Sequence, residues 1–251
     1  MVDLLQEHHD EEWYGSIYQN VVVKWINSDN EKTFNNHYKN LDTRRELEKL
    51  GYDKESITYD YNAFGFRTKH FHNKGNSIVF LGCSHTEGVG LRYEDTYASV
   101  VSREIGLHSI NLGVSGGAMD TTFRLAYYWL PKLKPTFVVH QQPHQGRYEF
   151  FLSNDRNVRP IKLIPNLTDG PKFLRTWYMW HLKSDRNYSM NFEKNQHAVK
   201  NICNELNIEY ISLERPKLWD ITDFGRDLMH YGVETHKKVA QGVIQKIKEA
   251  M

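Results

Sequence analysis

One serine, one histidine and one aspartate in this sequence have types and positions suited to nucleophilic catalysis. Ser84 follows the apolar residues 78–81 and a Gly-Cys turn, so a strand that ends there presents its hydroxyl at the edge of a sheet. Far along the chain, Asp227 and His230 place a carboxylate and an imidazole in one short segment. A serine that a histidine deprotonates, while an aspartate orients the histidine, is an arrangement used for acyl transfer. These three residues are the predicted catalytic group, and hydrolysis is the expected chemistry.

The elements that must position these residues alternate between strands and helices. Apolar runs predict strands at residues 78–81, 109–112, 136–141 and 209–213, with a fifth near 161–164, and helical patterns cover residues 93–105, 120–130, 192–206 and 234–250. This alternation is typical of α/β proteins and predicts a doubly wound, mostly parallel, flavodoxin-like sheet flanked by helices. Asp120 is the expected N-cap of the second helix.

Two regions fall outside this alternation. Residues 1–75 predict an N-terminal appendage with an acidic start, a helix at 13–26, an Asn-rich connector, a charged helix at 43–50 and an extended Tyr59-Asp60-Tyr61 segment. The remaining residues, 76–251, form the predicted α/β domain. Within it, an aromatic insert at about 146–190 is too long for an ordinary connection and is expected to act as a lid or a binding insert.

Composition narrows the classes of partner. The chain has 251 residues, with 32 basic and 31 acidic side chains and a formal charge of +1. We therefore expect neither nucleic acid nor a membrane as a partner, and the oligomeric state stays open. The two cysteines do not suggest a disulfide framework, and no signal peptide or transmembrane segment is recognisable. A soluble, cytoplasmic protein without a cofactor is expected by default, with association to a virion as an alternative.

The residues around Ser84 resemble the first sequence block of the SGNH, or GDSL-type, hydrolases. In that family the block runs Gly-Asp-Ser with a glycine about four residues later. Gly82, Ser84 and Gly88 match it, whereas Cys83 stands at the position of the aspartate. The family's aspartate is not a member of the triad, so the resemblance retains the nucleophile.

Three further segments extend the resemblance. Residues 111–116, Asn-Leu-Gly-Val-Ser-Gly, are similar to the second block, and the resemblance implies that the Gly113 N–H and the Ser84 N–H form the oxyanion hole. Asp227-x-x-His230 is similar to the last block, in which histidine is the base and aspartate holds its other nitrogen. Residues 62–67 are similar to a segment that precedes the first block in some subgroups.

The third block departs from the family's Gly-x-Asn-Asp, whose asparagine is an oxyanion donor. The strand at 136–141 continues as Gln142-Pro143-His144-Gln145-Gly146-Arg147, which contains no asparagine. Counting from Pro135 places Gln145 at the asparagine position. Gln142, His144 and Arg147 could reach the same space and are candidate substrate-binding residues, together with Trp177, which could stack on a sugar.

The resemblance implies an esterase that forms an acyl intermediate on Ser84 and hydrolyses a small acyl ester, such as a carbohydrate O-acetyl group. The rival hypothesis is a catalytically weak or inactive module on the same scaffold that binds a glycan or serves a structural, phage-associated role. A nucleotide-binding protein is a more distant alternative, because the turn after Leu81 lacks Gly-x-Gly-x-x-Gly.

Two other hypotheses, a cysteine nucleophile and a metal site, are alternatives to the serine triad. Cys83 is an alternative nucleophile, but adjacent side chains at a strand end point in different directions, so only one of Cys83 and Ser84 can face His230. His70 and His72 together with His85, or His230 with His236, are alternative metal sites, although neither set has the spacing of a compact zinc site. No metal is therefore predicted.

Overall fold

The computed structural model describes residues 18–54, 56–69, 71, 76–152, 159–163, 172–217 and 220–251. Its strands are β1 (Val22–Val23), β2 (Tyr59–Asp60), β3 (Ser77–Leu81), β4 (His108–Asn111), β5 (Phe137–Gln141), β6 (Tyr148–Leu152), β7 (Arg159–Leu163) and β8 (Glu209–Leu213). Its α-helices are α1 (Glu31–Lys39), α2 (Leu41–Lys49), α3 (Ser84–Glu87), α4 (Tyr97–Ile105), α5 (Met119–Leu133), α6 (Lys172–His181), α7 (Asp185–Glu205) and α8 (Val233–Ala250). A short 3-10 turn at Tyr93–Asp95 precedes α4.

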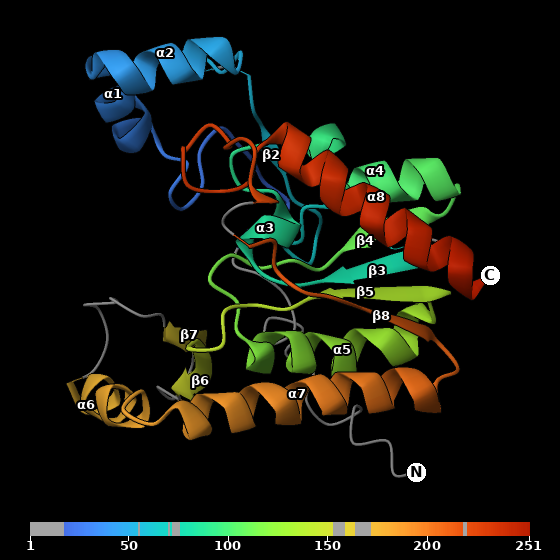
Figure 1. Cartoon of the computed structure of the whole chain (residues 1–251). Coiled ribbons are helices and arrows are strands. Elements are labelled where there is room, and N and C mark those ends of the chain that lie inside the picture. Colours follow the sequence, from blue (N-terminus) through green and yellow to red (C-terminus); the bar gives the residue numbers. More distant parts are fainter. Residues whose placement is uncertain are drawn as a thin grey trace.

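Four parallel strands form the central sheet in the order β4-β3-β5-β8 (Figure 1). Val79 of β3 pairs with Ile110 of β4 on one side and with Val138 of β5 on the other. Numbered along the chain, these strands have the order 2-1-3-4, which matches the start of the flavodoxin-like order. The predicted fold class is confirmed. The chain runs from β3 to β4 on one side of it and then crosses to β5 on the other side. In sheets of this kind, ligands bind at the carboxyl ends of the strands where the order reverses, which here is the carboxyl end of β3.

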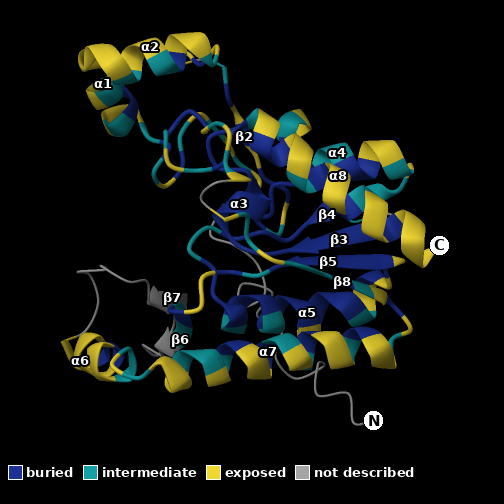
Figure 2. Cartoon of the chain, in the orientation of Figure 1, coloured by how far each residue is buried: buried dark blue, intermediate teal, exposed yellow. Residues whose placement is uncertain are grey.

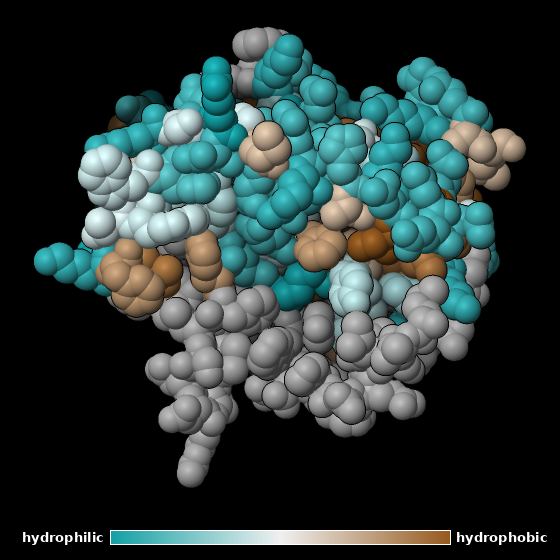
Figure 3. All heavy atoms as spheres, turned by 90° about the horizontal axis from the view of Figure 1, so that it is seen from below, coloured by the Kyte–Doolittle hydropathy of each residue, from teal (hydrophilic) through white to brown (hydrophobic). Residues whose placement is uncertain are grey.

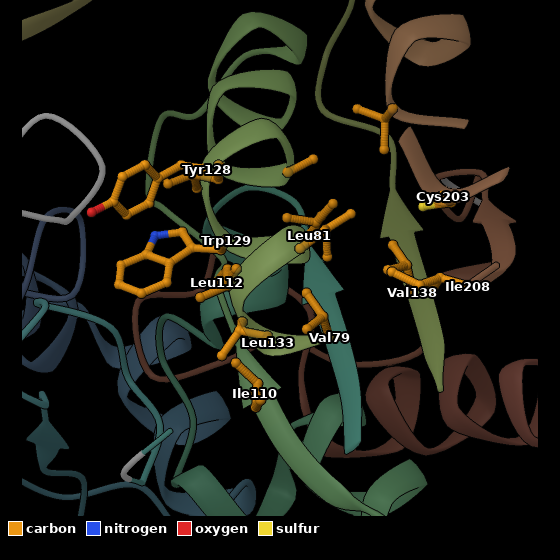
Figure 4. Close-up of a cluster of buried hydrophobic side chains, with 14 of the residues drawn as sticks. Val79, Leu81, Ile110, Leu112, Tyr128, Trp129, Leu133, Val138, Cys203 and Ile208 are labelled. Atoms are coloured by element: carbon orange, nitrogen blue, oxygen red, sulfur yellow. The ribbon is translucent and has the colours of Figure 1, made fainter. Parts of the chain in front are cut away.

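Helices cover both faces of this sheet. In Figure 1, α5 and α7 lie on one face and α4 and α8 on the other. Alternate residues of β3 serve the two sides: Val79 and Leu81 belong to the cluster under α5, whereas Ile78 and Phe80 belong to the cluster under α4 and α8. Figure 4 shows the first cluster, which combines Trp129 of α5 with side chains of β3, β4 and β5. A strand buried on both faces explains why residues 78–81 read as a continuous apolar run.

The pattern of burial follows these layers. In Figure 2 the central strands and α3 are buried, while the outward faces of α1, α2, α7 and α8 are exposed. The face seen in Figure 3 is mostly hydrophilic, with separate smaller hydrophobic areas. None of the helices in the described part of the chain combines the length and the apolar character that a membrane crossing requires.

The helix predicted at residues 13–26 is wrong in its described part. Residues 18–26 form extended chain and the short strand β1, in which Val22 pairs with Asp60 of β2. Three consecutive valines favour a pleated strand with a partner over a helix. Residues 1–17, including the acidic start, lie outside the described residues. A helix that the sequence reading missed, α1, begins after Asn30, whose side-chain oxygen accepts a hydrogen bond from the Thr33 N–H at 2.9 Å.

The aromatic insert contains a hairpin and a helix. The fifth predicted strand forms β7, but it pairs antiparallel with β6, and this two-stranded sheet is separate from the central one. The helix α6 follows, and α7 then begins at Asp185, earlier than residue 192 where the sequence pattern placed its start. Residue 164 lies outside the described residues.

The predicted N-cap of α5 is also wrong. The helix begins at Met119, so Asp120 lies in its first turn. The Asp120 carboxylate instead accepts a hydrogen bond from Asn195 Nδ2 of α7 at 2.9 Å. Asp120 therefore joins two neighbouring helices on one face of the sheet.

Candidate active site

Ser84, His230 and Asp227 are brought together in one hydrogen-bonded row. His230 Nε2 lies 2.7 Å from Ser84 Oγ, and His230 Nδ1 lies 2.6 Å from Asp227 Oδ2. Both distances are within the range of strong hydrogen bonds. With the proton on Nδ1, the imidazole donates to the carboxylate and its Nε2 is free to accept the serine proton. The arrangement can therefore transfer a proton away from Ser84.

The turn between β3 and α3 fixes the position of Ser84. A Cβ at Gly82 would lie 2.0 Å from Thr86 Oγ1 and 3.1 Å from the Gln141 carbonyl oxygen, so only glycine allows the chain to pass this close. Ser84 then opens α3, which ends at Gly88 in the left-handed conformation (φ +81°). A glycine tolerates this conformation without strain. The Ser84 side chain is held at the strand end and is 5% exposed.

The loop before α8 fixes Asp227 and His230 relative to each other. Asp227 Oδ1 accepts hydrogen bonds from the backbone N–H groups of Met229 (3.1 Å) and His230 (3.0 Å). Leu228, which directly follows Asp227, has a positive φ of +53°, which costs energy in a residue other than glycine. The Asp227 side chain therefore stabilises the tight turn that brings His230 over it.

The carboxylate of Asp227 is kept ionised. Burial by itself raises the pKa of a carboxyl group, but at Asp227 the hydrogen bonds and charge of His230, with a further hydrogen bond from Ser28, outweigh it and lower the pKa to about 2. An ionised acid in contact with Nδ1 stabilises an imidazolium. This is the electrostatic condition for a histidine base.

Ser28, which the sequence analysis did not single out, contacts the same carboxylate. Its Oγ donates to Asp227 Oδ2 at 2.6 Å and lies 3.4 Å from His230 Nδ1. The next residue, Asp29, forms a buried ion pair with Arg226, whose Nη2 lies 2.7 Å from Asp29 Oδ2. No local pattern could have revealed Ser28, because the contact spans 199 positions in the sequence.

The N-terminal region also supports the turn that carries Ser84. Arg67 is fully buried, and its two terminal nitrogens donate to the carbonyl oxygens of Gly88 at 2.6 Å and Leu91 at 2.7 Å. Tyr61 OH donates to Glu87 Oε1 at 2.7 Å. The segment at residues 62–67 thus lies against the first block in space as well as in sequence.

The predicted oxyanion donor Gly113 is engaged elsewhere. Its N–H donates to Asn111 Oδ1 at 2.9 Å, and the Asn111 amide donates to the Thr86 carbonyl oxygen at 2.7 Å. A Cβ at Gly113 would lie 2.4 Å from the Glu87 nitrogen, so only a glycine here allows the loop that follows β4 to pack this closely against α3. The role of Gly113 as an oxyanion donor stays a prediction, and in this structure its N–H is donated to Asn111. No hydrogen bond from the Ser84 N–H occurs among the residues that the structure describes.

The loop after β5 borders a cavity of about 720 Å³. Gln142, His144 and Gln145 line it, and Arg215 from the segment after β8 lines it as well. Gln145 is exposed and makes no hydrogen bond to another described residue. Gln142 Nε2 instead reaches Ser212 Oγ of β8 at 3.1 Å. The structure thus brings these residues to one cavity, and none of them forms a hydrogen bond with Ser84 among the described residues.

Arg147 and Trp177 lie in different surroundings. Arg147 Nη1 donates a long hydrogen bond of 3.4 Å to the carbonyl oxygen of Gly117, in the loop that follows β4. Trp177 of α6 stacks on His181, with ring centroids 4.5 Å apart, and meets Tyr148 edge to face. Trp177 is therefore part of an aromatic cluster within the insert, and no contact joins it to the row at Ser84 among the described residues.

His85 lies between His230 and Arg215, which lines the cavity. Its ring stacks on Tyr231 at a centroid distance of 3.7 Å and lies 4.9 Å from the ring of His230. Arg215 Nη2 lies 3.3 Å from His85 Nε2. Burial, followed by the charges of His230 and Arg215, lowers the pKa of His85 well below its usual value, so this ring is neutral.

The competing readings gain no support from the described residues. Cys83 is 1% exposed and forms no disulfide. Within the described part of the chain, no group of three or more His, Cys, Asp or Glu side chains could hold a metal ion. His70 and His72 of the alternative metal site lie outside the described residues.

No protein-family model and no curated protein matches this sequence. Among solved structures, the chain is similar to a psychrotrophic esterase from Pseudoalteromonas sp., with 16% identity, coverage of 69% of this chain and 97% of that one, and a TM-score of 0.38. It is also similar to a protein from Desulfitobacterium hafniense described as lipolytic and of the G-D-S-L family, with 13% identity, coverage of 68% and 99%, and a TM-score of 0.35. An acetylxylan esterase from Geobacillus stearothermophilus shares 14% identity, with coverage of 71% and 96% and a TM-score of 0.36.

Proposed function

We propose that this chain is a serine esterase of the SGNH type, in which Ser84 is the nucleophile, His230 the general base and Asp227 the orienting acid. One observation carries the proposal: two short hydrogen bonds, of 2.7 Å and 2.6 Å, connect the serine hydroxyl through the imidazole to an ionised carboxylate. A strand-end serine alone is usually a helix cap, but this row gives it a proton acceptor.

The proposed reaction has two stages. Ser84 Oγ attacks the ester carbonyl while its proton moves to His230 Nε2, and Asp227 stabilises the resulting imidazolium. The tetrahedral intermediate collapses as the imidazolium gives that proton to the leaving alcohol, which leaves the acyl group on Ser84. A water molecule then attacks the acyl-enzyme in the same way, with His230 again taking and returning the proton.

The proposed oxyanion hole relies on the Ser84 N–H and has fewer donors than the resemblance implies. The Gly113 N–H is already donated to Asn111, and the third block lacks its asparagine. Losing one donor of an oxyanion hole costs roughly 10²–10³ in rate. We therefore expect slow turnover of unactivated esters and more readily measured turnover of activated ones.

The proposed substrate is a small acyl ester of a polar compound, including carbohydrate O-acetyl esters. The cavity that Arg215 lines also carries the polar side chains of Gln142 and His144, which can hydrogen-bond a polar substrate.

Hydrolysis of 4-nitrophenyl acetate tests this function. The wild-type chain is expected to release 4-nitrophenol faster than Ser84→Ala by at least about 10³-fold, since the triad acts as a unit. Ser99→Ala, in α4, is a matched control for the loss of a hydroxyl and should keep the wild-type rate. Equal rates in wild type and Ser84→Ala, with both proteins folded, would overturn the assignment.

The rival function, a binding module with a weak or inactive triad, is favoured by the occupied Gly113 N–H and the missing asparagine. It predicts no Ser84-dependent turnover together with retained binding of a glycan. The same pair of proteins, tested for hydrolysis and for glycan binding, separates the two functions.

A further inference from the structure

Arg215 is held by the two residues that follow members of the triad. Its Nη2 meets His85, next to Ser84, and its side chain also interacts with that of Tyr231, next to His230. His85 and Tyr231 stack on each other, so Arg215 contacts two rings that are themselves in contact. The position of Arg215 is therefore tied to the place where the reaction is proposed to occur.

Arg147 approaches the same place from the loop after β5. Its Nη1 reaches the carbonyl oxygen of Gly117, and a Cβ at Gly117 would lie 3.4 Å from the carbonyl oxygen of Gly82. Burial lowers the pKa of His85 and of His144, and the charges of Arg147 and Arg215 lower both further. Two cationic side chains from separate segments thus act on the same pair of histidines.

Neither arginine has its charge balanced by a contact within the described residues. Arg215 meets only the neutral ring of His85 and the phenol of Tyr231, and Arg147 meets a backbone carbonyl. The Nε of each side chain is buried and donates to nothing. By contrast, the buried guanidinium of Arg226 is paired with a carboxylate at 2.7 Å. An unpaired, partly buried guanidinium is costly, and a ligand anion removes that cost.

Two carboxylates near the cavity do not fill this role. Asp185 and Glu214 line it with Arg215, but both are exposed and neither forms an ion pair with Arg215 among the described residues. The Asp185 carboxylate accepts a hydrogen bond from Tyr188 OH at 2.7 Å. Water and salt screen exposed charges of this kind more strongly than they screen a buried donor.

We infer that the esterase proposed above acts on esters that carry a carboxylate, and that Arg147 and Arg215 bind this carboxylate beside Ser84. The inference rests on the proposed function and narrows its substrate class from small polar esters to anionic ones. Two arginines suit a carboxylate because guanidinium groups donate paired hydrogen bonds to its two oxygens.

Matched esters test the inference. Two pairs of esters are compared by kcat/KM after subtraction of the uncatalysed rate. 4-Nitrophenyl hydrogen succinate, with its carboxylate on the acyl part, is compared with neutral 4-nitrophenyl acetate, and 4-acetoxybenzoate, with its carboxylate on the alcohol part, is compared with neutral methyl 4-acetoxybenzoate. The wild-type chain should prefer one of the anionic esters over its neutral counterpart by about 10- to 100-fold, the usual effect of hydrogen bonds to a charged group. The anionic ester with the larger preference shows whether the carboxylate belongs on the acyl part or on the alcohol part of the substrate.

Arg215→Gln and Arg147→Gln should each reduce this anionic-to-neutral ratio about tenfold or more, mainly through KM, whereas Arg215→Lys should keep part of it. Arg103→Gln, at an exposed position of α4, is the matched control and should leave the ratio unchanged. A wild-type ratio near one, or a ratio that neither glutamine variant changes, overturns the inference while Ser84-dependent hydrolysis of the neutral ester still stands.

Ligand binding to the inactive Ser84→Ala variant tests the carboxylate site independently of the proposed esterase activity. Ser84→Ala should bind monomethyl succinate in calorimetry, and Ser84→Ala with Arg215→Gln should bind it at least tenfold more weakly. If no ester is hydrolysed, the proposed function fails, yet this binding difference still supports the anion site. Equal binding by the two proteins overturns the site.

Discussion

Ser28 Oγ donates a hydrogen bond to Asp227 Oδ2 at 2.6 Å, on the oxygen that also contacts His230 Nδ1. The N-terminal region therefore takes part in the row of hydrogen bonds that ends at Ser84. This region shares a hydrophobic cluster with Val89 and Leu91, which follow α3, so its packing is continuous with the site. A residue outside the α/β core thereby contacts the proposed catalytic acid.

Replacing Ser28 by alanine should reduce kcat for 4-nitrophenyl acetate about tenfold with little change in KM, because Asp227 loses a charge-stabilising donor without any change to the cavity. The same change should raise the pKa of Asp227 above its value of about 2. Carboxyl NMR titration of Asp227 measures this shift, which a merely structural role of Ser28 would not produce. Ser28→Thr keeps the hydroxyl and should retain most activity, and Ser56→Ala, in the same region, is the control.

Replacing Asp29 by asparagine should reduce the free energy of unfolding by about 3–5 kcal/mol, because it leaves the buried guanidinium of Arg226 without its counter-ion. Urea denaturation measures the change. Lys54→Gln removes one partner of the exposed pair with Glu31 and should change stability by less than about 1 kcal/mol. A loss for Asp29→Asn as small as that of the control would contradict the structural role of the buried pair.

Two buried histidines should make the protein less stable as the pH falls. Burial lowers the pKa of His140 and of His236 to about 3 in the folded chain, whereas an unfolded histidine has a pKa of about 6.5. Between these values the unfolded state binds more protons, so stability is full above pH 6.5 and is lost as the pH falls toward 3. Each histidine should contribute about 1.4 kcal/mol per pH unit.

Urea denaturation at pH 6.5, 6 and 5 measures this dependence. His236→Gln should have a shallower slope by about one proton, while His197→Gln, at an exposed position of α7, should keep the wild-type slope. Identical slopes for wild type and His236→Gln would show that His236 is protonated in the folded protein.

The parts of this molecule that local sequence determines could be predicted. The four strands of the central sheet were predicted because each is a short apolar run with turn residues on both sides, and the strand-turn-helix around Ser84 reads directly from Gly82. The nearness of Asp227 to His230 also follows from sequence, since they lie three positions apart.

Contacts between distant segments could not be predicted in this way. Ser28 and Arg215 reach the site only through the packing of their segments, and neither has a distinctive local pattern. The Gly113 N–H was assigned to an oxyanion hole from the resemblance of residues 111–116 to the second block, and the sequence does not indicate that the Asn111 side chain folds back to accept this N–H. The helix predicted at residues 13–26 failed for a related reason: the partner strand of Val22 lies 38 positions away, at Asp60.

Labelling with a fluorophosphonate, followed by mass spectrometry of the modified peptide, tests the central claim most directly, since the probe reacts only with a serine that its surroundings activate. The account predicts an adduct on Ser84 in the wild-type chain, and labelling slower by at least about 10³-fold in His230→Ala, whose serine has lost its proton acceptor. A folded wild-type chain that stays unlabelled, or that carries the adduct on another residue, would contradict it.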